Sequence, residues 1–182
     1  MSNQKKQIEI ELRALLNKEE YQDLKKFLKN NALDLGEDNK NVYFFLLPKK
    51  IVKVVNNLSK KTAEIVMKLN RLGKGSNDFE EITLNIKPSD FKKAVKIFSQ
   101  IDFEQVQKSF QKRHNYRYRG VDLALKYSQS WGYHLELEIV IDNISKQKKA
   151  EEKIRRVAKV LGVRVMTEKE IAEFARKIDQ KH

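Results

Sequence analysis

The chain has 182 residues, of which 35% are charged and 40% are hydrophobic, and its formal net charge is +13 at pH 7. This length predicts a single domain over residues 1–182, with enough apolar residues to form a core. The sequence has no cysteine, which excludes disulfides and thiolate metal sites. No apolar run is long enough to span a membrane, so we expect a cytoplasmic protein without a membrane partner. The positive charge favours anionic partners such as nucleotides, polyphosphate or nucleic acid.

Alternating apolar and polar residues predict strands, and apolar residues at helical spacing predict helices. In chain order, the predicted strands are 8–13, 42–47, 51–55, 64–70, 79–86, 106–119, 122–127 and 133–142. The predicted helices are 18–31, 91–101, 148–161 and 167–178. About eight antiparallel strands with helices between them predict an α+β protein. Eight such strands can close into a β-barrel, so we expect an eight-stranded closed antiparallel barrel with flanking helices.

Two of the predicted strands contain alternating carboxylates. The first has Glu9 and Glu11 with Arg13 two residues further on, and the last has Glu136 and Glu138. If the two strands share a sheet face, four carboxylates converge there, and a divalent cation or nearby Lys or Arg must offset their repulsion. The same alternation also fits an ordinary antiparallel strand with one face in water.

Other charged residues have the strand parity of this polar face. They are Lys53, Lys68, Glu81 and Arg113. Burial of so many charges costs free energy unless they pair with one another, with metal ions or with a substrate, so a polar barrel interior indicates a functional site. Carboxylate ligands suit Mg²⁺ or Mn²⁺, and Lys and Arg suit phosphate oxygens. Together these residues predict a site for a metal-bound polyphosphate.

The ordered set of motifs resembles the CYTH proteins, also called triphosphate tunnel metalloenzymes. This family includes class IV adenylate cyclases, thiamine triphosphatases and inorganic triphosphatases. Four motifs in chain order are the basis of the resemblance: 9–13 for the ExExK signature, Lys68 for a strand lysine, Arg113 with Tyr116 for a K/R-x-x-Y strand, and 131–138 for an LGxFxExE hairpin.

The resemblance implies a closed antiparallel tunnel that binds a triphosphate with Mg²⁺ or Mn²⁺. By resemblance, the metal-binding residues are Glu9, Glu11, Glu81, Glu136 and Glu138, and the catalytic residues among them are Glu9, Glu11 and Glu138. The resemblance also implies that the triphosphate-binding residues are Arg13, Lys53, Lys68, Arg113 and Lys126. One metal ion would organise the phosphates and a second would activate the nucleophile.

The sequence departs from the family pattern at two of these positions. Arg13 replaces the signature lysine, which keeps the charge but changes its geometry. Lys126 stands where the family has an aspartate that supports the metal ions. Lys126 would either neutralise the carboxylates and reduce metal affinity or add a phosphate contact. Asp122 has the same parity, but it lies about 13 Å away along a strand.

We therefore expect a metal-dependent phosphohydrolase that acts on inorganic tripolyphosphate, a nucleoside triphosphate or thiamine triphosphate. Two alternatives stay open. One is a class IV adenylate cyclase that converts ATP to cyclic AMP and pyrophosphate, and the other is a noncatalytic protein that binds RNA or another polyanion. The expected partner is a triphosphate-containing small molecule, nucleic acid is the alternative partner, and the resemblance allows a homodimer.

Overall fold

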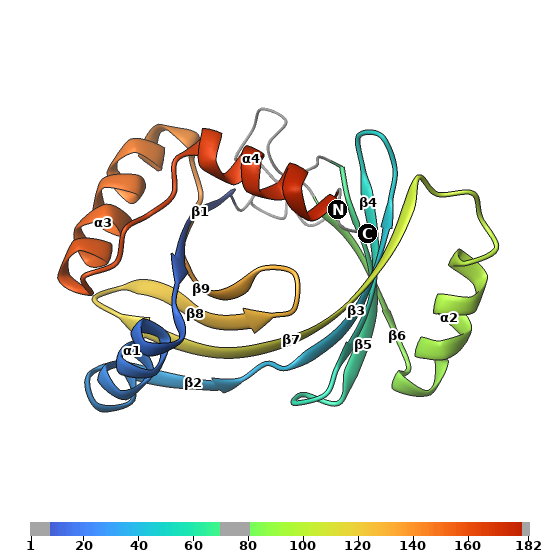
Figure 1. Cartoon of the computed structure of the whole chain (residues 1–182), viewed down its shortest axis with the longest axis horizontal. Helices are drawn as coiled ribbons and strands as arrows, with labels where there is room; N and C mark the ends of the chain where they lie inside the picture. The colour runs from blue at the N-terminus through green and yellow to red at the C-terminus, as the bar shows by residue number, and fades with distance from the viewer. Residues whose placement is uncertain (1–7, 70–80, 180–182) are drawn as a thin grey trace. The chain divides into compact units, whose positions relative to one another are not determined.

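The computed structural model of the protein describes residues 8–69 and 81–179 (Figure 1). Within these ranges the chain forms nine strands and four α-helices, an α+β composition. The strands are β1 (Ile8–Leu16), β2 (Leu33–Glu37), β3 (Lys40–Leu46), β4 (Ile51–Asn57), β5 (Thr62–Lys68), β6 (Glu81–Ile86), β7 (Gln105–Tyr118), β8 (Val121–Ser128) and β9 (Gly132–Ile141). The α-helices are α1 (Lys18–Asn31), α2 (Phe91–Phe98), α3 (Gln147–Val160) and α4 (Glu168–Asp179).

Hydrogen bonds connect the strands in the order β1-β9-β8-β7-β3-β4-β5-β6, and β2 also pairs with β7. The registers of β1 with β9, and of β3, β4, β5 and β6 with their neighbours, are antiparallel. The order is an open path across residues 8–69 and 81–179, since no pairing returns from β6 to β1. The antiparallel sheet with flanking helices is confirmed, but hydrogen bonds do not close it into the predicted barrel.

The structure contains a ninth strand, β2, in a stretch whose sequence predicts no strand. Its two leucines, Leu33 and Leu35, are 60% and 44% exposed, so β2 buries no apolar face. A strand of five residues without a buried face has no hydrophobic pattern that distinguishes it from a loop. The prediction of eight strands is therefore wrong by one. Residues 70, 79 and 80 of the predicted strands lie outside the described residues.

The described residues form two compact units. Unit 1 consists of the described chain through Gly36, of His114–Lys126 and of Gly132–Thr167. Unit 2 consists of Glu37–Arg113, Tyr127–Trp131 and the described chain from Glu168. Helices α1 and α3 belong to unit 1, and helices α2 and α4 belong to unit 2. The single domain over residues 1–182 stays a prediction.

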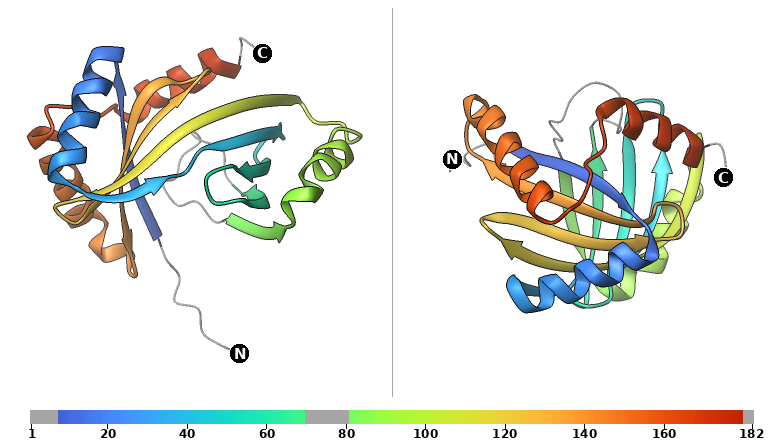
Figure 2. Two further views of the ribbon diagram at one scale, coloured as in Figure 1. Left: turned by 90° about the horizontal axis from the view of Figure 1, so that it is seen from below. Right: turned by 60° about the vertical axis from the view of Figure 1, so that its left-hand side comes forward.

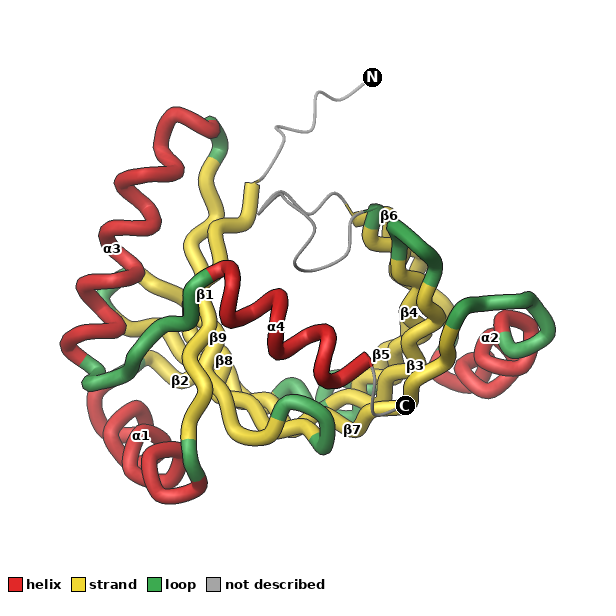
Figure 3. Tube along the Cα trace, turned by 45° about the horizontal axis from the view of Figure 1, so that its top comes forward, coloured by secondary structure: helices red, strands yellow, loops and turns green. Residues whose placement is uncertain are grey.

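In unit 1, α1 and α3 pack against one face of β1 and β9 (Figure 3). The alternation of β1 produces this face, because Ile10 and Leu12 are buried with Leu137 of β9 while the residues between them point to the other face. Helix α1 begins with a capping box in which the Asn17 side chain accepts from the Glu20 amide and the Glu20 carboxylate accepts from the Asn17 amide. The apolar face of β1 and β9 thus holds the helices, and the charged face lies opposite them.

A two-residue turn, Arg119-Gly120, joins β7 to β8 in unit 1. Both residues have positive φ, 52° for Arg119 and 70° for Gly120. Positive φ at both positions is the geometry of a type I′ hairpin turn, whose twist matches that of the strands it joins. After this turn, Val121, Leu123 and Leu125 enter the core, so Lys126 points to the opposite face.

In unit 2, α2 packs against β4 and β5 and is the light green helix in Figure 2. Its core contains Phe45 and Val54, which are both fully buried. The rings of Phe45 and Phe98 have centroids 5.5 Å apart. Burial of Val52 and Val54 on this face of β4 leaves Lys53 and Val55 on the other face.

No helix in the described part of the chain combines the length and the apolar composition that crossing a membrane requires.

We expect Leu137→Ala to reduce the free energy of unfolding by about 2–5 kcal/mol, the range for a buried Leu truncation that leaves a cavity. Leu137 is 0% exposed on the helix-facing side of β9. Val140→Ala on the same strand is the matched control, because Val140 is 47% exposed. Urea denaturation of both variants measures the difference. An equal loss in the two variants would contradict the assignment of the buried face.

Candidate functional site

The charged face of unit 1 is built by β1, β9 and β8. Cross-strand pairing sets Glu11 opposite Glu138 and Arg13 opposite Glu136. Residues opposite each other in an antiparallel pair project from the same face, so these four side chains share the face opposite α1 and α3. Glu9 precedes Glu11 by two residues on that face and stands opposite Val140.

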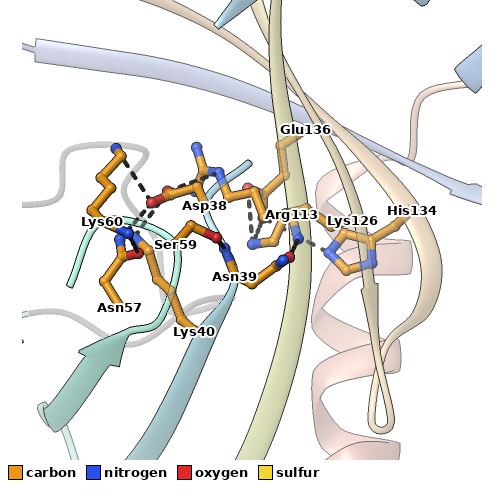
Figure 4. Close-up of polar contacts among 10 residues, drawn as sticks. All are labelled: Asp38, Asn39, Lys40, Asn57, Ser59, Lys60, Arg113, Lys126, His134 and Glu136. Carbon is orange, nitrogen blue, oxygen red and sulfur yellow. Dashed lines mark hydrogen bonds and ion pairs between the residues drawn. The ribbon is translucent and has the colours of Figure 1, made fainter. Parts of the chain in front are cut away.

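Four charged side chains of unit 1 form a buried ion network. The Nε atom of Arg13 lies 2.5 Å from Oε1 of Glu11 and 3.3 Å from Oε1 of Glu136. The ammonium of Lys126 donates to both carboxylate oxygens of Glu136, over 3.0 and 3.1 Å (Figure 4). All four side chains are between 10% and 15% exposed. We call this group the Glu136 network.

Burial and charge together set the ionisation of the groups in this network. Burial raises the pKa of Glu11, and the positive charge of Arg13 only partly offsets this. Burial lowers the pKa of Arg13, but the carboxylates of Glu11 and Glu136 raise it by more, so the guanidinium stays charged. The Glu136 network therefore contains two carboxylates and two cations and sums to zero when all four are ionised.

His134 lies next to this network and is neutral at pH 7. Burial and then the positive charge of Lys126 lower the pKa of His134 to about 4. Its Nδ1 atom lies 3.1 Å from the backbone carbonyl oxygen of Gly132, which accepts only, so Nδ1 bears the hydrogen of the neutral ring. Its Nε2 atom lies 4.0 Å from Oε1 of Glu136. The imidazole adds no positive charge to the carboxylates.

Unit 2 holds the other predicted site residues, of which Lys53, Lys68 and Arg113 lie on the face opposite α2. Lys53 and Lys68 alternate with the residues of β4 and β5 that form the core on the α2 side, and Arg113 has the parity of Gln111, which pairs with Lys40. Glu81 pairs with Lys68 in register at the start of β6, and its side chain lies outside the described part of the structure. The predicted site residues thus fall into two groups. The carboxylates of β1 and β9 lie with Arg13 and Lys126 in unit 1, and the other predicted residues belong to unit 2.

A second charged cluster in unit 2 surrounds Asp38 (Figure 4). The carboxylate of Asp38 is 4% exposed and accepts a 2.5 Å hydrogen bond from Nδ2 of Asn57. The ammonium groups of Lys40 and Lys60 lie 3.1 and 3.2 Å from its oxygens, and Nε of Arg113 lies 3.6 Å away. One carboxylate thus holds three cations, which come from β3, from the turn after β4 and from β7. The excess of positive charge suits an anion.

The backbone fixes the Asp38 cluster as well. The Asp38 amide donates to the carbonyl oxygen of Arg113 over 2.8 Å, and the Arg113 amide donates to Oδ1 of Asn39 over 3.0 Å. The Asn39 amide donates to the hydroxyl of Ser59 over 2.9 Å. The first two bonds link the residues that precede β3 to Arg113, a predicted phosphate-binding residue, and the third links Asn39 to the β4–β5 turn.

Sequence reasoning missed Asp38, Lys40 and Lys60. The predicted strand began at Val42, whereas β3 begins at Lys40, so the strand parity of Lys40 was not used. An earlier start would have placed Lys40 on the face of Lys53 and Arg113. No sequence signal pairs Asp38 with Lys60, because the contact depends on the β4–β5 turn.

The described residues contain no group of three or more His, Asp or Glu side chains arranged to hold a metal ion. The oxygen donors of Glu9, Glu11 and Glu138 are of the kind that Mg²⁺ and Mn²⁺ prefer. Both oxygens of Glu136 accept hydrogen bonds from Lys126, so a metal ion would have to replace the Lys126 ammonium to bind this carboxylate.

Comparison with protein-family models matches residues 54–170 to the CYTH domain, which is more than half of the 182 residues. Comparison with curated proteins finds no match. The structure is similar to a conserved hypothetical protein from Pyrococcus furiosus, with a TM-score of 0.70 and 23% identity over 90% of this chain and 99% of the other.

Two further solved structures share the fold. One is a Hippeastrum protein that bears the name adenylyl cyclase and is reported with a dominant triphosphatase activity; its TM-score is 0.62 at 16% identity, over 88% of this chain and 90% of the other. The other is the capping enzyme triphosphatase of Mimivirus, with a TM-score of 0.53 at 15% identity, over 88% of this chain and 92% of the other. The family match covers more than half of the residues, so the chain belongs to the CYTH family.

We expect Asp38→Asn to reduce the free energy of unfolding at pH 7 by about 1–3 kcal/mol, because the variant removes a buried charge partner of three cations. Burial raises the pKa of Asp38, but the hydrogen bond from Asn57 and the charges of Lys40 and Lys60 lower it by more, to well below the ordinary value of 3.8. A depressed pKa stabilises the fold above about pH 4, and this stabilisation decreases as the pH falls further. The difference between wild type and variant should therefore narrow in acid.

Urea denaturation at pH 7, 4 and 2.5 measures this difference. Asp23→Asn is the control, because the Asp23 side chain is 69% exposed and lies 3.7 Å from Lys26. A difference between wild type and Asp38→Asn that stays constant with pH would show that the charge of Asp38 does not stabilise the cluster.

Proposed function

We propose that the protein is a divalent-metal-dependent phosphohydrolase that acts on a triphosphate. The observation that supports this proposal most strongly is the register of β1 and β9, in which Glu11 stands opposite Glu138 and Arg13 opposite Glu136. Three carboxylates and one guanidinium thus meet on a face of β1 and β9 that contributes nothing to the apolar core. Membership of the CYTH family adds to the proposal.

In this proposal Glu9, Glu11 and Glu138 hold the metal ion and are the catalytic carboxylates, with Glu81 as a further acidic position. A bound Mg²⁺ or Mn²⁺ ion neutralises phosphate charge and lowers the pKa of a water molecule. Lys126 donates to both carboxylate oxygens of Glu136, whereas Arg13 contacts Glu11 at Oε1.

Phosphate binding falls to the cationic residues of the two faces. We assign it to Arg13, Lys53, Lys68 and Arg113, and Lys126 stays a further candidate. A guanidinium offers a planar pair of donors to phosphate oxygens, and a lysine ammonium acts as a compact charge. The Asp38 cluster holds the guanidinium of Arg113 from one side, which limits the positions it can take. Closure of the strands into a tunnel is part of the proposal.

The proposal is tested by phosphate release from tripolyphosphate, ATP and thiamine triphosphate. Each substrate is supplied with Mg²⁺, with Mn²⁺ and with a chelator. Turnover that requires the metal supports the proposal, and the best substrate identifies the group attached to the triphosphate. The products from ATP separate two activities: ADP and phosphate indicate a hydrolase, and cyclic AMP and pyrophosphate indicate a cyclase. Triphosphate binding without turnover, insensitive to chelator and weakened by salt, indicates a noncatalytic polyanion binder.

We expect Glu9→Gln and Glu138→Gln each to reduce turnover of the best substrate by at least about 100-fold, the size of effect seen when a group that stabilises transition-state charge is removed. Glutamine keeps the shape of the side chain, so the far-UV spectrum and the unfolding midpoint should change little. Glu151→Gln is the control, because Glu151 pairs with Arg155 on the surface of α3. Turnover retained in both Glu9→Gln and Glu138→Gln would rule out this site assignment.

A further inference from the structure

The carboxylate of Glu136 is bound by cations that belong to the protein itself. Lys126 donates to both of its oxygens over 3.0 and 3.1 Å, and Nε of Arg13 lies 3.3 Å from one of them. The Lys126 and Glu136 side chains are 11% and 10% exposed. A buried ion pair is costly to break by removal of one partner, because the charge that remains loses its compensation where water cannot replace it.

Within the Glu136 network, the positive charges equal the negative charges in number, so the charge of the Glu136 carboxylate is compensated. Glu11 and Glu136 contribute two negative charges, and Arg13 and Lys126 contribute two positive charges. The register of β1 and β9 fixes Arg13 opposite Glu136, and the strand parity of β8 directs Lys126 to the same face. Each cation of the network therefore has a backbone position that keeps it near the carboxylate.

A divalent ion that used Glu136 as a ligand would have to displace the ammonium of Lys126. The displaced ammonium would stay close to the ion, because β8 holds Lys126 beside Glu136, and the guanidinium of Arg13 would lie nearby as well. Repulsion among like charges grows as the surrounding dielectric falls, so it is large at a site this deeply buried. The neighbouring His134 does not relieve this repulsion, because its ring is neutral and its Nδ1 faces the Gly132 carbonyl oxygen.

We infer that the ammonium of Lys126 acts as a built-in cation at Glu136 and occupies the position that a divalent metal ion would otherwise take at this carboxylate. This inference rests on the proposed function for the identity of the site, and it refines that function. Glu136 is then a positioning residue that holds Lys126 and Arg13, and metal binding depends on the other carboxylates of the set. The chain binds fewer divalent ions than its full set of carboxylates predicts.

Titration of the full-length protein with Mn²⁺ tests the inference without substrate. Calorimetry gives affinity and stoichiometry, and the electron spin resonance signal of free Mn²⁺ provides an independent count. The variants are Lys126→Met, which keeps the length of the side chain without its charge, Glu136→Gln, and the double variant. Lys148→Met is the control for loss of one positive charge, because Lys148 lies exposed on α3.

We expect Lys126→Met to bind Mn²⁺ about 10–100-fold more tightly than wild type, or to bind one additional ion. A change of about 10–100-fold in metal affinity is typical when a residue that contacts a metal ligand is mutated. The double variant Lys126→Met/Glu136→Gln should lose this gain, because the gain requires the Glu136 carboxylate. Glu136→Gln alone should change the wild-type affinity much less than Glu138→Gln does. Lys148→Met should bind as wild type.

Thermal unfolding supplies a second readout that does not require a metal site in wild type. Lys126→Met leaves Glu136 without its ammonium, so its midpoint should fall in chelator and rise again when Mn²⁺ is added. The double variant has no charge to compensate, so it should unfold at a higher temperature than Lys126→Met in chelator. If Lys126→Met folds only in the presence of Mn²⁺, the result also supports the inference, because Mn²⁺ then takes the place of the missing ammonium at Glu136.

Two results would overturn the inference. One is an Mn²⁺ affinity of Lys126→Met equal to that of wild type. The other is a loss of wild-type Mn²⁺ binding in Glu136→Gln as large as that in Glu138→Gln. Failure of the proposed function gives a different pattern, which is absence of triphosphate turnover in wild type with the Mn²⁺ gain of Lys126→Met still present.

Discussion

Compensation of buried carboxylates is the constraint on which the charged face of unit 1 depends. Glu11 and Glu136 lie in a setting where an isolated negative charge costs several kcal/mol, and the raised pKa of Glu11 shows that burial dominates there. Arg13 and Lys126 offset this cost at fixed backbone positions. The opposite face of the same strands is apolar and holds α1 and α3. The strand pair thus has one apolar face and one face on which two cations compensate the buried carboxylates of Glu11 and Glu136.

The two units compensate their buried carboxylates in different ways. In unit 1 two carboxylates meet two cations, and the group is neutral in the absence of any ligand. In unit 2 the single carboxylate of Asp38 meets Lys40, Lys60 and Arg113, and the group has a net positive charge. The net positive charge around Asp38 favours anions there, whereas Arg13 and Lys126 already offset the charges of Glu11 and Glu136 in the other cluster.

Strand parity and helix periodicity could be read from the sequence, and long-range pairings could not. Helix 18–31 was predicted with the bounds that α1 has, because a clear apolar stripe ends at polar residues on both sides. The parity of Glu9, Glu11 and Arg13 in β1 was predicted because their neighbours are apolar without exception. The family was also predicted, and the match over residues 54–170 confirms it.

The parts that sequence reasoning missed share a physical cause. β2 has no buried face, and the Asp38 cluster depends on residues from three segments that only the folded chain assembles. The two possible roles of Lys126 could not be separated because parity gives the face of a residue but not its partner. The bidentate contact with Glu136 depends on how β8 and β9 lie beside each other.

The length of the turn Arg119-Gly120 affects the electrostatics of the charged face, because it sets the position of Lys126. Because side chains alternate along a strand, the number of residues in the turn decides which residues of β8 enter the core and which reach Glu136. One inserted residue that shifted β8 by a single position would direct the ammonium of Lys126 into the apolar core beneath α3 and present Leu125 to the carboxylate. The length of this hairpin turn thereby sets which side chains of β8 reach the buried carboxylates, and both turn residues have the positive φ that a two-residue type I′ turn requires.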